Sequence, residues 1–147
     1  LADDDTRGAF SQALQDAIER SNQANIVFVA AAGNSTINTD LTASYPSCYP
    51  NANVIVLGDI NDFEFSQTVD LIEGNVLTSL MDELPQEQRY SYVFEGNSQV
   101  LDHILASRKL YRTLTAYDVV HVNAEFADQA SDHDPQVARF VFDGEDD

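Results

Sequence analysis

Three short clusters of carboxylates and imidazoles carry the chemistry that this sequence offers. Each cluster adjoins an apolar run, so we expect it on a loop at the end of a strand. Hydrolysis of a phosphodiester needs a cation on the non-bridging oxygens, an oriented water and a group that accepts its proton. The clusters supply those residue types, and they are Gly58-Asp59-Ile60-Asn61-Asp62, Leu101-Asp102-His103 and Ser131-Asp132-His133-Asp134-Pro135.

Within these clusters, spacing and residue type suggest individual roles. Asp59 and Asn61 lie two positions apart just beyond an apolar run, where alternate side chains emerge on one side. We expect them to hold a phosphate oxygen or a metal-bound water. Asp132 offers a hard oxygen ligand, and His133 can exchange protons near neutral pH. Asp102 could orient an imidazole. The predicted cofactor is therefore a divalent cation, Mg²⁺ or Mn²⁺ with Ca²⁺ as an alternative, held by Asp132, Asp59 and Asn61.

Each cluster also has a purely structural interpretation. Residues 58–62 could form a turn, because Asn and Asp favour Asx and left-handed geometry. Residues 131–135 could form a capped turn closed by Pro135. His103 and His121 lie within apolar runs and are expected to be structural. The joint occurrence of the clusters favours the catalytic interpretation for Asp59, Asn61, Asp132 and His133.

Composition sets the outer limits. The chain has 147 residues and 44% hydrophobic residues, enough for about one folded domain. Its net charge of −18 repels phosphate backbones, so a nucleic acid or other phosphodiester substrate would need a cation. An acidic surface alone is also typical of secreted or salt-adapted proteins. Cys48 is single, which excludes an internal disulfide.

No segment has the signature of a membrane span or a signal peptide, so no membrane association is expected. Because the chain begins at Leu1 and not at Met, we expect a mature or partial form of a longer protein.

Hydrophobic periodicity predicts an α/β fold. The spacing of Phe10, Leu14 and Ile18 indicates an amphipathic helix that ends near residue 22. The apolar runs 26–32 and 54–57 indicate strands buried on both faces of a parallel sheet. A long loop rich in Asn, Ser and Pro joins them.

Further along the chain, Ser66 and Gly74 are expected to cap a helix, and a helical turn is expected at 77–84. Predicted strands cover 90–94, 100–106, 117–123 and 136–142, with a short helix at 108–111. The turn at 95–98 predicts that the first two of these strands form a hairpin.

The clusters lie in segments that resemble the endonuclease/exonuclease/phosphatase superfamily, most of all the C-terminal part of its secreted bacterial nucleases. The resemblance implies that Asp59 and Asn61 bind phosphate and metal-bound water. It also implies that Asp132 is a metal-associated carboxylate, that His133 transfers protons and that Asp102 is a supporting acid. The segments are VIVLGDINDFEFS (54–66), RYSYVFEGNSQVLDHILAS (89–107) and VVHVNAEFADQASDHDPQVARF (119–140).

Residues 10–58 resemble a different family, the subtilisin-like serine proteases, around Ala31-Ala32-Gly33-Asn34 and the two Tyr-Pro pairs at 45–46 and 49–50. This resemblance implies that Asn34 is an oxyanion-hole donor. The sequence has no GTSxA-type nucleophile motif and no HGT-type histidine motif, so a structural turn is expected for Asn34 here. In the endonuclease/exonuclease/phosphatase superfamily, the N-terminal half carries a metal-binding Glu, and this Glu has no counterpart here. Glu87 is assigned to a solvated turn.

Together these observations predict a chimera. Its expected parts are a subtilisin-like segment at 1–53, half of a nuclease domain at 54–142 and an acidic tail at 143–147. The predicted fold is a mixed sheet flanked by helices, forming half of a four-layer sandwich. The leading functional hypothesis is a metal-dependent phosphodiesterase fragment with an incomplete site and weak or no activity. The alternatives are a non-catalytic cation-binding protein and, ranked last, a serine protease fragment. An exposed sheet face predicts self-association, and both parent families predict secretion.

Overall fold

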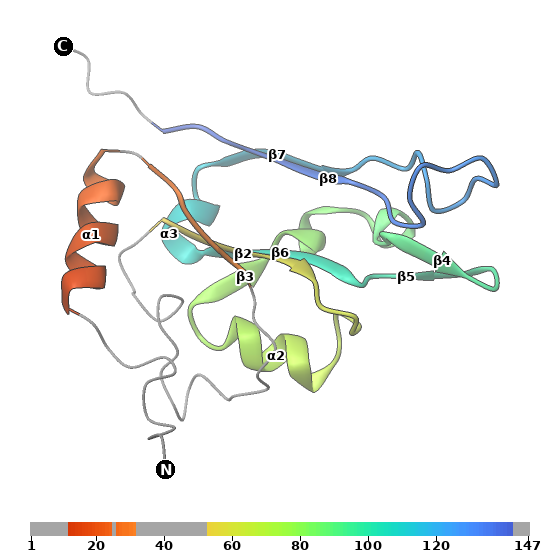
Figure 1. The fold of residues 1–147 in the computed structure, drawn as a ribbon, viewed down its shortest axis with the longest axis horizontal. Helices are drawn as coiled ribbons and strands as arrows, with labels where there is room; N and C mark the ends of the chain where they lie inside the picture. Colours follow the sequence, from red (N-terminus) through yellow and green to blue (C-terminus); the bar gives the residue numbers. More distant parts are fainter. Residues whose placement is uncertain (1–11, 25, 32–52, 143–147) are drawn as a thin grey trace.

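The computed structural model describes residues 12–24, 26–31 and 53–142. They form a mixed β-sheet with helices against it (Figure 1). The mixed α/β class predicted from the sequence is therefore confirmed. The second sheet of a four-layer sandwich stays a prediction.

The central sheet has four strands in the order β1-β2-β6-β3. β1 and β2 are parallel neighbours, which agrees with the parallel direction expected for these two strands. β6 runs antiparallel to both β2 and β3. The strands cover Phe28–Ala31 (β1), Val54–Asp59 (β2), Leu77–Ser79 (β3) and Asp102–Ser107 (β6).

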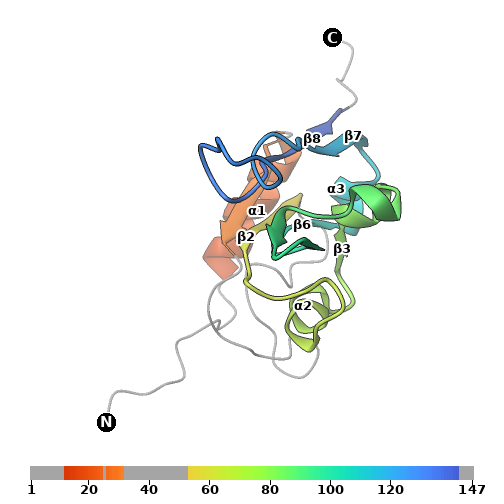
Figure 2. The same cartoon turned by 90° about the vertical axis from the view of Figure 1, so that its right-hand side faces the viewer.

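Opposite faces of this sheet are covered by different elements. One face packs against α1 (Gln12–Gln23) and α2 (Gln67–Glu73), and the other lies beneath the hairpin of β7 (Leu114–Val119) and β8 (Gln136–Phe140). Both views show α2 and this hairpin on opposite sides of the sheet (Figures 1 and 2).

Strand alternation explains the two-sided packing, because successive side chains point to opposite faces. Val54, Val56 and Leu105 face the helices, whereas Ile55 and Ala106 face the hairpin. All five are buried. The sheet is therefore the middle of three layers in the described part of the chain.

The predicted helices are well supported by local sequence. Ser66 caps α2, where its hydroxyl oxygen accepts from the Val69 N–H at 3.2 Å, and Gly74 ends it with φ 49°. The short helix α3 covers Arg108–Tyr111, as predicted. Caps act within a few residues of the helix end, so sequence alone exposes them.

Three structural predictions were wrong. Residues 77–84 begin as strand β3 and only then form a 3₁₀ helix, η2 (Leu80–Glu83), because Leu77 and Ser79 complete the edge of the sheet beside β6. The turn at Glu95 and Gly96 joins β4 (Tyr92–Phe94) to β5 (Asn97–Gln99), so the hairpin partner of β4 is β5, whereas β6 belongs to the central sheet. β1 is not buried on both faces, since Val29 is 56% exposed.

A further 3₁₀ turn, η3 (Gln86–Gln88), follows η2 and carries the exposed Glu87, in agreement with the solvated turn predicted there. β1 and β2 pair across the predicted boundary at residue 53, and the division into segments stays a prediction. Among the described residues, no helix is long and apolar enough to cross a membrane. Asn34, both Tyr-Pro pairs and the tail at 143–147 lie outside the described residues.

Candidate functional site

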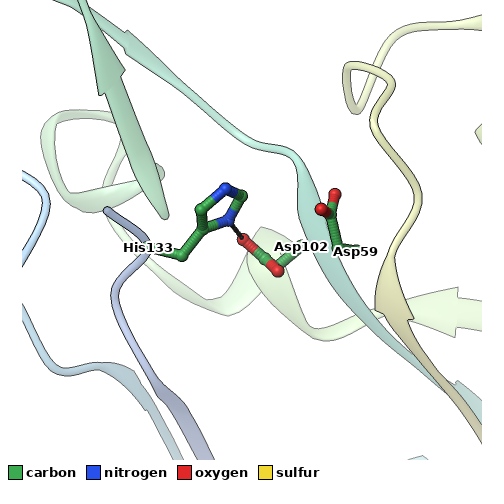
Figure 3. Close-up of side chains that lie close together, drawn as sticks. All are labelled: Asp59, Asp102 and His133. Carbon is green, nitrogen blue, oxygen red and sulfur yellow. Dashed lines mark hydrogen bonds and ion pairs between the residues drawn. The ribbon is translucent and has the colours of Figure 1, made fainter. Parts of the chain in front are cut away.

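Three of the predicted residues converge at one end of the central sheet. Asp59 is the last residue of β2, Asp102 is the first residue of β6, and the two are paired in the antiparallel register. His133 arrives from the loop between β7 and β8. One ligand atom from each of the three lies within 4.8 Å of the others (Figure 3).

The shortest contact in this group joins His133 to Asp102. The Nδ1 atom of His133 lies 2.6 Å from Asp102 Oδ2, and each side chain is 24% exposed. An ionised carboxylate only accepts hydrogen bonds, so Nδ1 carries the hydrogen. In the neutral ring Nε2 then holds the free lone pair, which fits a proton acceptor. The role predicted for Asp102, orientation of an imidazole, agrees with this geometry.

The surroundings of His133 favour its protonated form. Partial burial lowers the pKa of His133, but the hydrogen bond to Asp102 and the negative charges of Asp102, Asp59 and Asp132 outweigh it, so its pKa lies above the ordinary value. The ring is therefore a stronger base than a free imidazole. It acts as a base only where the pH is high enough to deprotonate it.

Asn61 is held against Asp59 in a tight local turn. Its backbone N–H donates to Asp59 Oδ1 at 2.9 Å, and its side-chain Nδ2 donates to Asp59 Oδ2 at 3.0 Å. Asn61 has φ 54°, a left-handed conformation that Asn tolerates. The turn chemistry considered for residues 58–62 is thus present, and it places Asn61 beside the candidate site.

His103, which is buried, holds the loop that carries Asn61 through a hydrogen bond. It is 1% exposed, and its Nε2 lies 2.9 Å from the carbonyl oxygen of Asp62. Since His103 and Gly58 are partners in the β2–β6 ladder, this contact ties the loop to the sheet that carries Asp59. His103 is structural, as predicted.

Asp132 does not join the three-residue group. Its side chain is exposed, and among the described residues the group that could hold an ion comprises Asp59, Asp102 and His133. Asp132 contributes through space, because its charge helps to raise the pKa of His133. Direct ligation by Asp132 and by Asn61 remains a prediction.

Two carboxylates and an imidazole are a donor set that suits a divalent cation. Carboxylate oxygens are preferred by Mg²⁺, Mn²⁺ and Ca²⁺, and an imidazole widens the choice toward Mn²⁺. The register also brings two like charges together on neighbouring strands. A cation between them would relieve that repulsion.

Two residues that sequence analysis missed, Ser91 and Gln136, hold the site together. Ser91 is 0% exposed, and its hydroxyl oxygen accepts from the backbone N–H groups of Leu101 and Asp102 at 3.3 and 3.1 Å. Gln136 donates from Nε2 to the Asp102 carbonyl oxygen at 2.7 Å. Serine and glutamine have no sequence signature for such contacts, because their partners lie far along the chain.

Asp134 and His121 form a second carboxylate–imidazole pair next to the first. The Nδ1 atom of His121 lies 2.9 Å from Asp134 Oδ2, and its ring stacks on Tyr90 with centroids 3.9 Å apart. The structural role predicted for His121 agrees with this packing. Its acidic partner, Asp134, belongs to the predicted cluster at 131–135, where no role was predicted for it.

Comparison with known families places the chain in a single family. Residues 2–140 match the model of the subtilase family, Peptidase_S8, so the chain belongs to that family. No curated protein and no solved structure matches it.

The match corrects the interpretation of residues 54–142. It runs through the segments that resembled the endonuclease/exonuclease/phosphatase superfamily, and no nuclease family is detected. The identification as a nuclease and as a chimera of two families was therefore wrong, and the family ranked last is the one supported. The physical reason lies in the turns: Asp59 with Asn61 and Ser131 with His133 make local hydrogen bonds that favour these residue types in many folds.

Proposed function

We propose that this subtilase-family chain carries a cation-assisted hydrolytic site in which His133 is the general base. The observation that carries the proposal is the 2.6 Å contact between His133 Nδ1 and Asp102 Oδ2 beside a third carboxylate, Asp59. Asp102 orients the ring and stabilises the imidazolium that forms. Asp59, with Asn61 bound to it, supplies the oxygen atoms that would hold Mg²⁺, Mn²⁺ or Ca²⁺.

Each residue has a distinct part in the chemistry. His133 takes a proton at Nε2 from water that attacks an electrophilic centre, and Asp102 keeps the other ring nitrogen protonated. A divalent cation, when bound, stabilises negative charge that develops on the substrate. Peptide or ester carbonyls are the substrate class favoured by family membership. The phosphodiester substrate expected from the sequence has no support from the family match and enters the test as the competing outcome.

The test is hydrolysis of three reporters, p-nitrophenyl acetate, a chromogenic peptide and bis(p-nitrophenyl) phosphate, with Mn²⁺ or with EDTA. Loss of a general base should lower the rate of a His133→Ala variant by about 10²–10⁴-fold. Asp102→Asn should lower the rate by removing the acceptor that orients the ring, and Asp59→Asn should remove the response to Mn²⁺. Glu87→Gln, on the exposed turn η3, is the matched control.

The reporters separate the outcomes. Turnover of the acetate or peptide that depends on His133 supports the proposal, and turnover of the phosphate reporter alone would move the substrate class to phosphodiesters. Rates equal in wild type and the His133→Ala variant would reject a hydrolytic role for this site and leave cation binding as its function. Secretion, expected from the sequence, remains part of the proposal and is checked by locating the native protein.

The family match favours a second candidate, serine peptidase activity. Its oxyanion donor would be Asn34, which lies outside the described residues. Among the described residues, the ring of His133 is hydrogen-bonded to Asp102 and to no serine hydroxyl. A fluorophosphonate probe decides this candidate: covalent labelling of a serine supports it, and labelling equal to that of heat-denatured protein rejects it.

A further inference from the structure

A carboxylate that the proposed mechanism does not use is the most completely satisfied acid in the described part of the site. The Asp134 side chain is 0% exposed. Its Oδ1 accepts from three consecutive backbone N–H groups, those of Val122, Asn123 and Ala124, at 3.0, 2.7 and 3.0 Å. Its Oδ2 accepts from His121 Nδ1 at 2.9 Å.

These contacts make Asp134 the centre of the loop between β7 and β8. Burial by itself raises the pKa of Asp134, but the hydrogen bonds from His121 and from the three amides outweigh it and lower the pKa below the ordinary value. The carboxylate therefore stays ionised. It links the backbone amides of residues 122–124, at the start of the loop, to Asp134 near the end of the loop. A buried charge with partners of this kind is costly to disturb.

The same anchor fixes the peptide group that joins His133 to Asp134. The Asp134 N–H donates to the Ser91 carbonyl oxygen at 2.7 Å, and Asn123 Nδ2 donates to the His133 carbonyl oxygen at 2.9 Å. His133 also forms a β-bridge with Tyr92, whose ring lies 4.8 Å from the imidazole. Ser91 in turn accepts from the Asp102 N–H. One short segment therefore holds both partners of the His133–Asp102 pair.

We infer that Asp134 and His121 are positioning residues, which hold the loop in the conformation that brings His133 onto Asp102. The inference rests on the role proposed for His133, but its test does not require activity. Asp134 and His121 thus place the His133–Asp102 pair, and neither of them is inferred to contact substrate.

The experiment follows the His133 Nδ1 proton by NMR, since a hydrogen bond to a carboxylate shifts it downfield and slows its exchange with water. Replacement of Asp134 by Ala removes all four contacts, and replacement by Asn keeps an oxygen for the amides but loses the charge. Hydrogen bonds to a charged group are strong enough that we expect exchange to accelerate about tenfold in Asp134→Asn, and further in Asp134→Ala. Asp128→Asn, exposed on the same loop, is the control and should leave exchange unchanged.

Amide exchange at Val56 and Leu105, in the buried sheet, shows whether the fold survives. Accelerated exchange of the His133 proton with the sheet still protected supports the inference. If Asp134→Ala loses the sheet, Asp134→Asn decides. An unchanged His133 proton in any folded Asp134 variant overturns it and leaves Asp134 as a stabiliser of its own loop.

Activity offers an independent check. A positioning role predicts a lower kcat with little change in KM for the best reporter. If no reporter is hydrolysed, the proposed function fails while the NMR result still supports or rejects the positioning role, so the two failures are distinguishable.

Discussion

Asp59 and Asp102 are direct cross-strand partners at the end of the β2–β6 ladder. Like charges placed opposite each other destabilise an antiparallel pair by roughly 0.2–1 kcal/mol. Here the His133 ring lies against Asp102 and offers a partial counter-charge. The two carboxylates thus repel each other, unless a cation or a protonated imidazole lies between them.

Removing one of these charges separates stability from cation binding. Without added metal, Asp59→Asn loses the repulsion but also weakens the hydrogen bonds from Asn61, so the free energy of unfolding should change by less than about 1 kcal/mol. With Mn²⁺, wild type should gain stability and the variant should gain much less. Urea unfolding with and without Mn²⁺ measures both effects.

Asp132→Asn is the informative comparison, since Asp132 lies outside the three-residue group. Mn²⁺ binding as tight in this variant as in wild type would show that Asp132 is not a ligand of the cation. A loss as large as in Asp59→Asn would instead make Asp132 a ligand, as the sequence suggested.

The His133–Asp102 pair should make stability depend on pH. The pKa of His133 is raised in the folded chain, so its contribution is fully present below the unfolded pKa of about 6.5 and is lost as pH rises through the folded value. We expect less than about 1 kcal/mol, because the pair is partly exposed to solvent. The difference in unfolding free energy between wild type and Asp102→Asn, measured from pH 5 to 9, should shrink as pH rises. A difference that is constant over this range would contradict the raised pKa.

Leu105 is the central core residue of β6 and is 0% exposed. Leu105→Ala should lower the free energy of unfolding by about 2–5 kcal/mol through lost burial and a residual cavity. Val137→Ala, at a side chain that is 53% exposed on β8, should change it by less than about 0.5 kcal/mol. Equal effects would mean that the sheet does not pack as described.

Self-association is predicted at the β1 end of the hairpin-covered face. Val29 is 56% exposed and Leu57 is 41% exposed, and their register places both on the side that carries Ile55. Sedimentation velocity should show concentration-dependent association of wild type that Val29→Glu abolishes. Phe94→Ser, at the exposed tip of the β4–β5 hairpin, should have no effect. A wild-type chain that stays monomeric at every concentration would remove this prediction.

Sequence patterns determined the features that depend on neighbours along the chain. The cap at Ser66, the end of α2 at Gly74, the short helix α3 and the parallel direction of β1 and β2 followed from turn chemistry and apolar runs. Asp59, Asp102 and His133 were also named as site residues from type and spacing alone. The family was misassigned at 54–142, because short polar motifs at strand ends satisfy local hydrogen bonds in unrelated folds.

Tertiary structure decided which of these residues meet. His133 and Asp102 are separated by 31 residues, and His121 reaches Asp134 across the base of its loop. The buried Ser91 links the two pairs, because its hydroxyl oxygen accepts from the Asp102 N–H and its carbonyl oxygen accepts from the Asp134 N–H. Both donors are backbone N–H groups, which nearly every residue type possesses and no sequence pattern distinguishes. Asp132, adjacent to His133 in sequence, faces solvent instead. Residue type and spacing thus indicated the site residues. Their geometry was decided by the packing of the β7–β8 loop against β6, which sequence patterns do not reveal because it depends on partners distant in the chain.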